Sequence, residues 1–241
     1  MAKYCFAGTA VAFGALALWA GSASATMGPC KPAAFDLLCG SGDGAARVIL
    51  KTLSPSKRLA FAWRNANEPP TTRPEENDPN LQNFVVRLDD GAVLARSHGA
   101  YWDLGTKIAK AYLMSAWSPD SHLLIKVEQR ADSASAELFS FGENDAAIGP
   151  FDLVDVVKPA VMAKMTNSKQ TSNPTLVFAA HPAMTVNDQG VMHAGVFMMM
   201  QDADGPPYDV ILQIARIANS INAKVMSVTP HAGPTVSIIV Q

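Results

Sequence analysis

Short runs of apolar and β-branched residues, broken by tight turn sequences, make up most of the chain beyond residue 45. Runs of this length with a period of two are typical of β-strands, and a Ser-Pro or Asp-Gly pair between two runs favours a hairpin. The first such turns are Ser54-Pro55-Ser56 and Asp89-Asp90-Gly91. We therefore predict four successive strands that form one antiparallel meander, at 47–53, 57–64, 83–88 and 92–96.

The same order of runs and turns repeats twice more along the chain. The second set predicts strands at 113–117, 122–128, 137–141 and 152–157, and the third at 183–186, 191–200, 208–217 and 224–229. The turns that open the three sets begin at Ser54, Ser118 and Asn187, at nearly equal intervals. We predict an all-β domain over 26–241 with three units, at about 45–97, 111–157 and 175–229. A helix over 210–221 is the alternative to a strand that ends at Ile217 and a turn at 219–222.

The turn of the second unit resembles a known repeat. Ala116-Trp117-Ser118-Pro119-Asp120-Ser121, followed by Leu123-Leu124-Ile125, is similar to the Trp-Ser-Pro-Asp-Gly turn of bacterial WD-type β-propeller repeats, as in the periplasmic propeller of the Tol system. Less similar copies lie at 53–60 and 186–190. The resemblance implies propeller-blade-like meanders. Blades usually have about 40–45 residues, and propellers have at least about four of them, so we expect an incomplete propeller or stacked sheets here.

The first 25 residues have the pattern of a signal peptide. Lys3 supplies a positive charge, an apolar run covers 6–20, and Ala23-Ser24-Ala25 places small residues at the cleavage positions. A membrane anchor is the alternative, but a spanning helix needs about 20 continuous apolar residues, and this run is shorter. We expect cleavage after Ala25 and a mature chain that is periplasmic or secreted, without a membrane anchor.

Cysteine usage agrees with export. Cys5 leaves with the signal peptide, and the pair Cys30 and Cys39 remains. Oxidising compartments allow such a pair to form a disulfide. Because the spacing is wider than the Cys-x-x-Cys arrangement of redox-active pairs, we predict a structural disulfide.

The low charge of the chain disfavours two classes of partner. The formal net charge is −2 and only 17% of residues are charged. Nucleic acids and anionic membrane surfaces are bound by basic patches, so neither is an expected partner. We expect a protein or a glycan instead.

Residues that bind metals or cofactors are scattered. The histidines are His98, His122, His181, His193 and His231, and no two of them have the His-x-x-x-His spacing of a helical metal site. Methionines of the predicted strand at 191–200 have thioether groups that suit Cu(I). On a strand, however, Met192 and Met198 face one side and His193 the other. We interpret this strand as buried on both faces and predict no metal and no cofactor.

The candidate ligand-binding residues are Tyr101, Trp102 and Asp103. They follow a turn, and we expect them to form an exposed aromatic surface, because aromatic rings with a polar neighbour suit ligand contact. Trp63 and Trp117 lie on predicted strands and are expected in the core.

Two functions of different classes fit these observations. The preferred one is a non-catalytic binding or scaffold module that contacts its partner with sheet edges and end-loops. The alternative is a periplasmic hydrolase whose polar residues, such as His98, Asp103 and His181, meet only in three dimensions.

Three units in a row leave two outer faces to be covered. We expect internal capping by the disulfide-held N-terminal segment, the loop at 65–80 and a C-terminal strand at 235–240, which gives a monomer. A symmetric dimer that forms a six-unit ring is the alternative.

Overall fold

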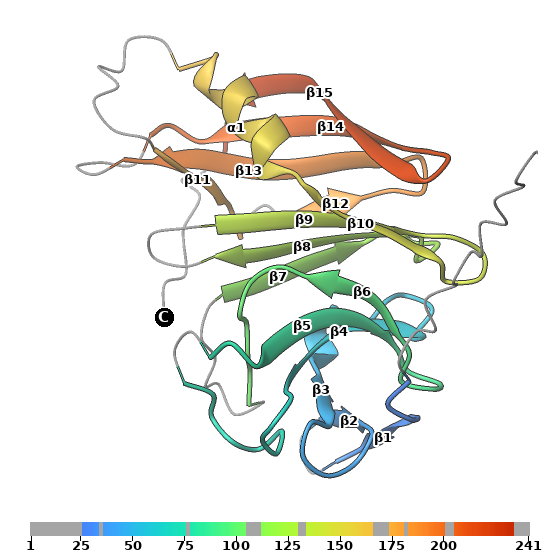
Figure 1. Ribbon diagram of the computed structural model, residues 1–241. Coiled ribbons are helices and arrows are strands. Elements are labelled where there is room, and N and C mark those ends of the chain that lie inside the picture. Colours follow the sequence, from blue (N-terminus) through green and yellow to red (C-terminus); the bar gives the residue numbers. More distant parts are fainter. Residues whose placement is uncertain are drawn as a thin grey trace, which may run out of the picture.

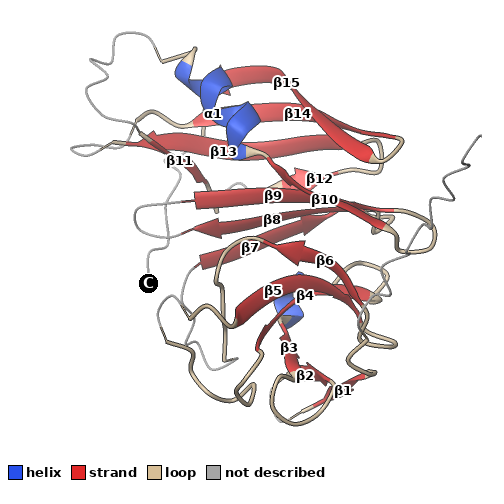
Figure 2. Cartoon of the chain, in the orientation of Figure 1, coloured by secondary structure: helices blue, strands red, loops and turns tan. Residues whose placement is uncertain are grey.

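The computed structural model describes residues 26–33, 36–75, 78–104, 112–129, 134–165, 174–180, 183–200 and 205–233. Their strands form three antiparallel sheets that follow one another along the chain (Figures 1 and 2). Among these residues no sheet closes into a barrel, which confirms the predicted all-β fold of meander units without a complete propeller. The predicted signal peptide lies outside the described residues.

In the first sheet each strand pairs with its neighbour in sequence. The strands are β1 (Cys30–Pro32), β2 (Leu37–Cys39), β3 (Ala46–Val48), β4 (Leu59–Asn65), β5 (Leu81–Arg87) and β6 (Val93–Ser97). Both predicted hairpins are present, but β1 and β2 were not predicted. The predicted strand at 47–53 is also too long. A 3-10 turn, η1 (Leu50–Thr52), follows β3, and in it the Thr52 hydroxyl donates to the Ile49 carbonyl (2.7 Å) and accepts the Phe61 N–H (2.9 Å).

The N-terminal segment covers the outer face of the first sheet. The N–H of Cys30 donates to Leu88 O (2.9 Å), so the chain returns to the β5–β6 turn. The predicted disulfide between Cys30 and Cys39 is present and joins β1 to β2. Met27, Cys30 and Leu37 pack on an apolar cluster of β3, β4 and β5. In the chain-entropy model this short loop contributes about 2–3 kcal/mol. The C-terminal strand expected at 235–240 lies outside the described residues.

The second sheet has the order β10-β9-β8-β7. Its strands are β7 (Tyr112–Trp117), β8 (Leu123–Gln129), β9 (Ala134–Phe141) and β10 (Ala147–Asp152). The fourth strand predicted at 152–157 is wrong, because helix α1 (Val154–Met162) occupies most of this range. The Asp152 carboxylate accepts the N–H of Val154 at the helix start (2.8 Å). Val157 and Val161, four residues apart, then share one buried helix face.

The third sheet has the order β11-β13-β14-β15, with β12 also paired to β13. Its strands are β11 (Thr175–Phe178), β12 (Thr185–Val186), β13 (Val191–Met199), β14 (Tyr208–Ile217) and β15 (Ser220–Pro230). The strand that ends at Ile217 is confirmed, and the alternative helix over 210–221 is wrong. The turn is tighter than predicted, because Ile217 pairs directly with Ser220. β11 was not predicted.

The second sheet is the middle layer of the stack (Figure 1). On one face Leu124, Phe139 and Phe141 join a core with residues of the first sheet. On the other face Ile125 and Leu138 join a core with the third sheet and α1. No helix among the described residues is long and apolar enough to span a bilayer.

The three repeated turns are built alike, although the third, from Asn187 to Val191, is one residue shorter than the other two. In each, the first side chain accepts the N–H that closes the turn, from Leu59 to Ser54 Oγ (3.1 Å), from Leu123 to Ser118 Oγ (2.9 Å) and from Val191 to Asn187 Oδ1 (2.9 Å). In each, the fourth residue has a left-handed backbone, with φ of 57° at Lys57, 65° at Ser121 and 74° at Gly190. The recurrence seen in the sequence therefore reflects a shared turn structure.

Hydrogen bonds link each of these turns to the next. The N–H of Ser56 donates to Ser121 Oγ (3.0 Å), and the N–H of Asp120 donates to Asp188 Oδ1 (2.8 Å). The three turns consequently lie side by side at one end of the molecule. We call this the turn end.

Candidate functional site

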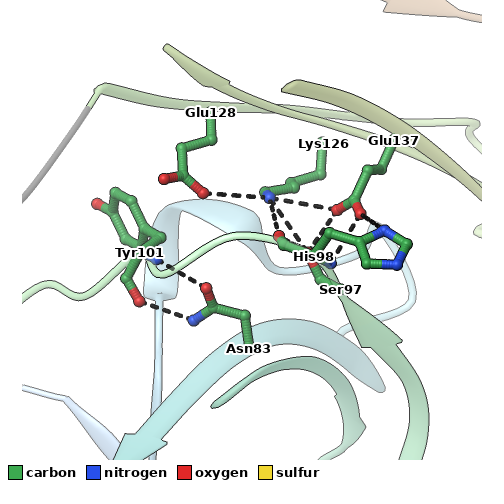
Figure 3. Close-up of polar contacts among 7 residues, drawn as sticks. All are labelled: Asn83, Ser97, His98, Tyr101, Lys126, Glu128 and Glu137. Atoms are coloured by element: carbon green, nitrogen blue, oxygen red, sulfur yellow. Dashed lines mark hydrogen bonds and ion pairs between the residues drawn. The ribbon is translucent and has the colours of Figure 1, made fainter. Parts of the chain in front are cut away.

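A cluster of charged side chains is buried between the first and second sheets (Figure 3). Lys126 on β8 is fully buried, and its register partner on β9 is Glu137. Glu128, two residues further along β8, lies on the same face. Lys126 Nζ is 3.2 Å from Glu137 Oε2 and 3.4 Å from Glu128 Oε2. Buried charges are costly unless they are paired, and this ammonium has two carboxylates.

The Glu137 carboxylate ties the end of the first sheet to the second. Its Oε1 accepts the backbone N–H of His98 (2.8 Å) and contacts His98 Nδ1 (2.9 Å). Its Oε2 accepts the Ser97 hydroxyl and the Lys126 ammonium. A carboxylate has about four acceptor positions, so all four are used. We interpret the cluster as a clamp between the two sheets.

Ser97 and Lys126 are the residue types of a Ser-Lys hydrolase, and their polar atoms are 3.1 Å apart. In such a site the amine must accept the serine proton. Here four oxygen atoms surround Lys126 Nζ, those of Ser97, His98, Glu128 and Glu137. An ammonium has three N–H donors and no acceptor, and this environment suits the ammonium. Ser97 therefore accepts from Lys126 and donates to Glu137, which holds its proton in place.

The expectation that Tyr101, Trp102 and Asp103 form an exposed surface is wrong. Tyr101 is 0% exposed and Trp102 4%, and both belong to the core between the first two sheets. The Asn83 amide bonds to both the N–H and the carbonyl of Tyr101, at 2.7 Å each (Figure 3). Asp103 accepts the Tyr101 hydroxyl (3.0 Å). Burial is the main reason that the pKa of Tyr101 is raised.

The two strand tryptophans lie where the first and second sheets meet. Trp63 is fully buried, as predicted, and its indole N–H donates to Asp103 O (2.9 Å). Trp117 is half-buried and packs against this core, with its indole N–H on Thr52 O (2.8 Å) and its ring beside Phe141.

The residues suggested for a dispersed hydrolase site take different partners. His98 contacts Glu137, whereas Asp103 contacts Tyr101 and Trp63. His181 lies outside the described residues. On β13, Met192 and Met198 are buried in the core against the second sheet and His193 is exposed, which confirms that they face opposite sides. The prediction that both faces of this strand are buried is wrong at His193 and is confirmed only for residues 194–198.

An open pocket of about 340 Å³ lies at the turn end, between the second and third sheets. Its apolar lining consists of Leu123, Phe141 and Ile214. Its charged and ionisable lining consists of Asp120, His122, Glu143, Asp188 and Arg216. These residues come from the β7–β8, β9–β10 and β12–β13 turns and from the adjoining ends of β8, β9 and β14, which explains why no single sequence motif indicated them.

The charged groups of this pocket differ in how far they are already bonded. Asp120 is bonded to Ser118 and His122, and Asp188 Oδ1 accepts the Asp120 N–H. Among the described residues, neither the Glu143 carboxylate nor the Arg216 guanidinium takes part in an ion pair. An added Cβ at Gly142 would lie 3.0 Å from Arg216 Nη1, so this guanidinium lies close over the β9–β10 turn.

Burial opposes the ionisation of Asp120, but hydrogen bonds from Ser118 and the His122 N–H outweigh it. The pKa of Asp120 therefore lies below its ordinary value of 3.8. A carboxyl group of this kind stabilises the fold above that pH, and the contribution disappears as the pH falls through the folded-state pKa.

We predict that Asp120→Asn lowers the free energy of unfolding near pH 6 and that the difference from wild type shrinks as the pH falls below the ordinary carboxyl value of 3.8 and through the lower folded-state pKa of Asp120. Urea denaturation at a series of pH values measures both free energies. A difference that does not change with pH would show that ionised Asp120 does not stabilise the turn.

Comparisons with protein-family models, curated proteins and solved structures found no match for this chain.

Proposed function

We propose that this protein is a non-catalytic binding module of the periplasm or the extracellular space, and that it takes its partner at the turn-end pocket. The observation that carries this proposal is the pocket itself. It combines an apolar lining with side chains of both charges, among which Glu143 and Arg216 have no ion-pair partner in the described part of the chain.

The construction of the turn end supports this role. Binding residues are commonly held on loops by a rigid scaffold, and here the hydrogen bonds between neighbouring turns fix the rim before any partner arrives. Little ordering of the protein is then needed on binding, which favours affinity. We also infer that the sheets are blade-like units similar to WD-type repeats, on the basis of the shared turn geometry.

The disulfide between Cys30 and Cys39 supports the proposed compartment. Structural disulfides persist in oxidising compartments and are rare in the cytosol. The predicted leader at 1–25 agrees with this location.

The proposal is tested by site-specific photo-crosslinking in cells that export the full chain. A photoreactive residue at Gln189, on the pocket rim, should give a discrete high-mass adduct on irradiation. The matched control is the same residue at Thr71, which is exposed in the β4–β5 loop at the opposite end of the strands. Equal adducts at both positions, or none at Gln189, would contradict binding at the pocket.

A further inference from the structure

We propose that the turn-end pocket binds a lysine or arginine side chain on an exposed segment of a partner protein. This inference rests on the proposed function and specifies the chemistry of the partner.

The charge of the lining favours a cation. Three carboxylates, those of Asp120, Glu143 and Asp188, face one guanidinium, that of Arg216, so the lining is net negative when His122 is neutral. A basic side chain gains Coulomb energy in this environment. Anionic glycans and phosphates are repelled, and a neutral glycan gains nothing from the charge.

The shape and apolar lining favour a long basic side chain over a compact cation. The pocket volume of about 340 Å³ lies at the lower end of ligand sites, which have about 300–1,000 Å³. Lysine and arginine bury an apolar stem and keep a charged head in a polar environment. Leu123 and Ile214 suit the stem, and the acidic side chains suit the head.

The presence of Arg216 in the pocket favours a peptide ligand over a free amine. A guanidinium has five N–H donors and no acceptor. The backbone carbonyls on either side of a basic residue are acceptors of this kind, and a peptide brings them to the rim together with its side chain.

The test uses peptides that differ only in one central residue, which is Lys, Arg, norleucine or Glu. Each is titrated to millimolar concentration into the ¹⁵N-labelled mature chain, and binding is followed by NMR. We expect shifts at 120–123, 142–143 and 188–190, with Kd values for the Lys and Arg peptides at least about tenfold lower than for the norleucine peptide. The Glu peptide should not bind.

Variants of single carboxylates complete the test. Asp188→Asn and Glu143→Gln should each raise the Kd of the Lys peptide by about three- to tenfold. Added salt should raise this Kd further. Glu75→Gln removes the same charge from the exposed β4–β5 loop and should leave the Kd unchanged. Unfolding is detected in the same spectra, so a misfolded variant is not counted.

Three outcomes would overturn the inference. The first is that the norleucine peptide binds as tightly as the Lys peptide. The second is that Asp188→Asn leaves the Kd of the Lys peptide as unchanged as Glu75→Gln does. The third is that a neutral oligosaccharide binds the pocket while the peptides do not. If the crosslink at Gln189 forms nonetheless, the binding function stands and only the basic side chain is rejected. If that crosslink also fails to form, the proposed binding function is rejected as well.

Discussion

Lys126→Met is expected to lower the free energy of unfolding by about 3–5 kcal/mol, because removal of one partner from a buried ion pair leaves the other charge uncompensated. Methionine has a similar length and no charge, so the change leaves little cavity. Glu128 and Glu137 would remain almost fully buried without their shared cation. Ser97 and His98 O would also lose the donor that joins them to the second sheet. Urea denaturation followed by circular dichroism measures the loss.

Two further variants separate the charge effect from a general intolerance of substitution. Adding Glu128→Gln and Glu137→Gln to Lys126→Met removes the two buried carboxylate charges that lose this ammonium and should recover part of the stability. Lys224→Met, at an exposed position of β15, should change it by no more than about 0.5 kcal/mol. A loss below about 1 kcal/mol for Lys126→Met would show that the cluster does not clamp the sheets.

Trp63→Ala should also lower the free energy of unfolding by about 3–5 kcal/mol, since large-to-small changes of buried aromatic residues leave a cavity. Trp63 is fully buried between the first and second sheets. Its indole N–H holds the main chain at Asp103 (2.9 Å), so the substitution also leaves that carbonyl without its donor. Chemical denaturation of the purified protein measures the change.

Trp63→Phe separates packing from hydrogen bonding. Phenylalanine fills most of the volume and loses the N–H, so we expect a cost of about 1–2 kcal/mol. If Trp63→Ala and Trp63→Phe cost the same, the hydrogen bond to Asp103 rather than the cavity dominates, and the packing argument is wrong.

Features set by short-range sequence were predictable. The turns at Ser54, Ser118 and Asn187 were found because a side-chain acceptor and a residue that tolerates a left-handed backbone lie within a few positions. The hairpins follow from such turns, and the disulfide between Cys30 and Cys39 follows from the prediction that Cys5 belongs to a cleaved leader.

Features that depend on distant contacts were missed. Tyr101 and Trp102 follow a turn and were expected outside, but Asn83 supplies hydrogen bonds to the Tyr101 backbone in the core. The range 152–157 has β-branched residues that suit a strand, yet Val157 and Val161 are buried at helical spacing. Tertiary packing thus overrode local preference.

The sequence of β8 contains a pattern that indicates the buried charge cluster. Lys126 and Glu128 alternate with Ile125 and Val127, in a stretch where both strand faces are buried. Opposite charges at such positions indicate a paired buried network. Glu143 and Arg216 have no comparable pattern in the sequence, because they come to line one pocket only through the packing of the second sheet against the third.

The double-sided burial of the second sheet has a consequence for folding. Its hairpins have local pairing and can form early, but neither face is complete without a neighbour, since one packs on the first sheet and the other on the third. The Lys126 ammonium of the second sheet also depends on a neighbouring sheet, because its partners Ser97 and His98 lie at the end of the first sheet. We therefore expect that the middle of the chain does not fold on its own and gains most of its stability when the first and third sheets dock on its two faces.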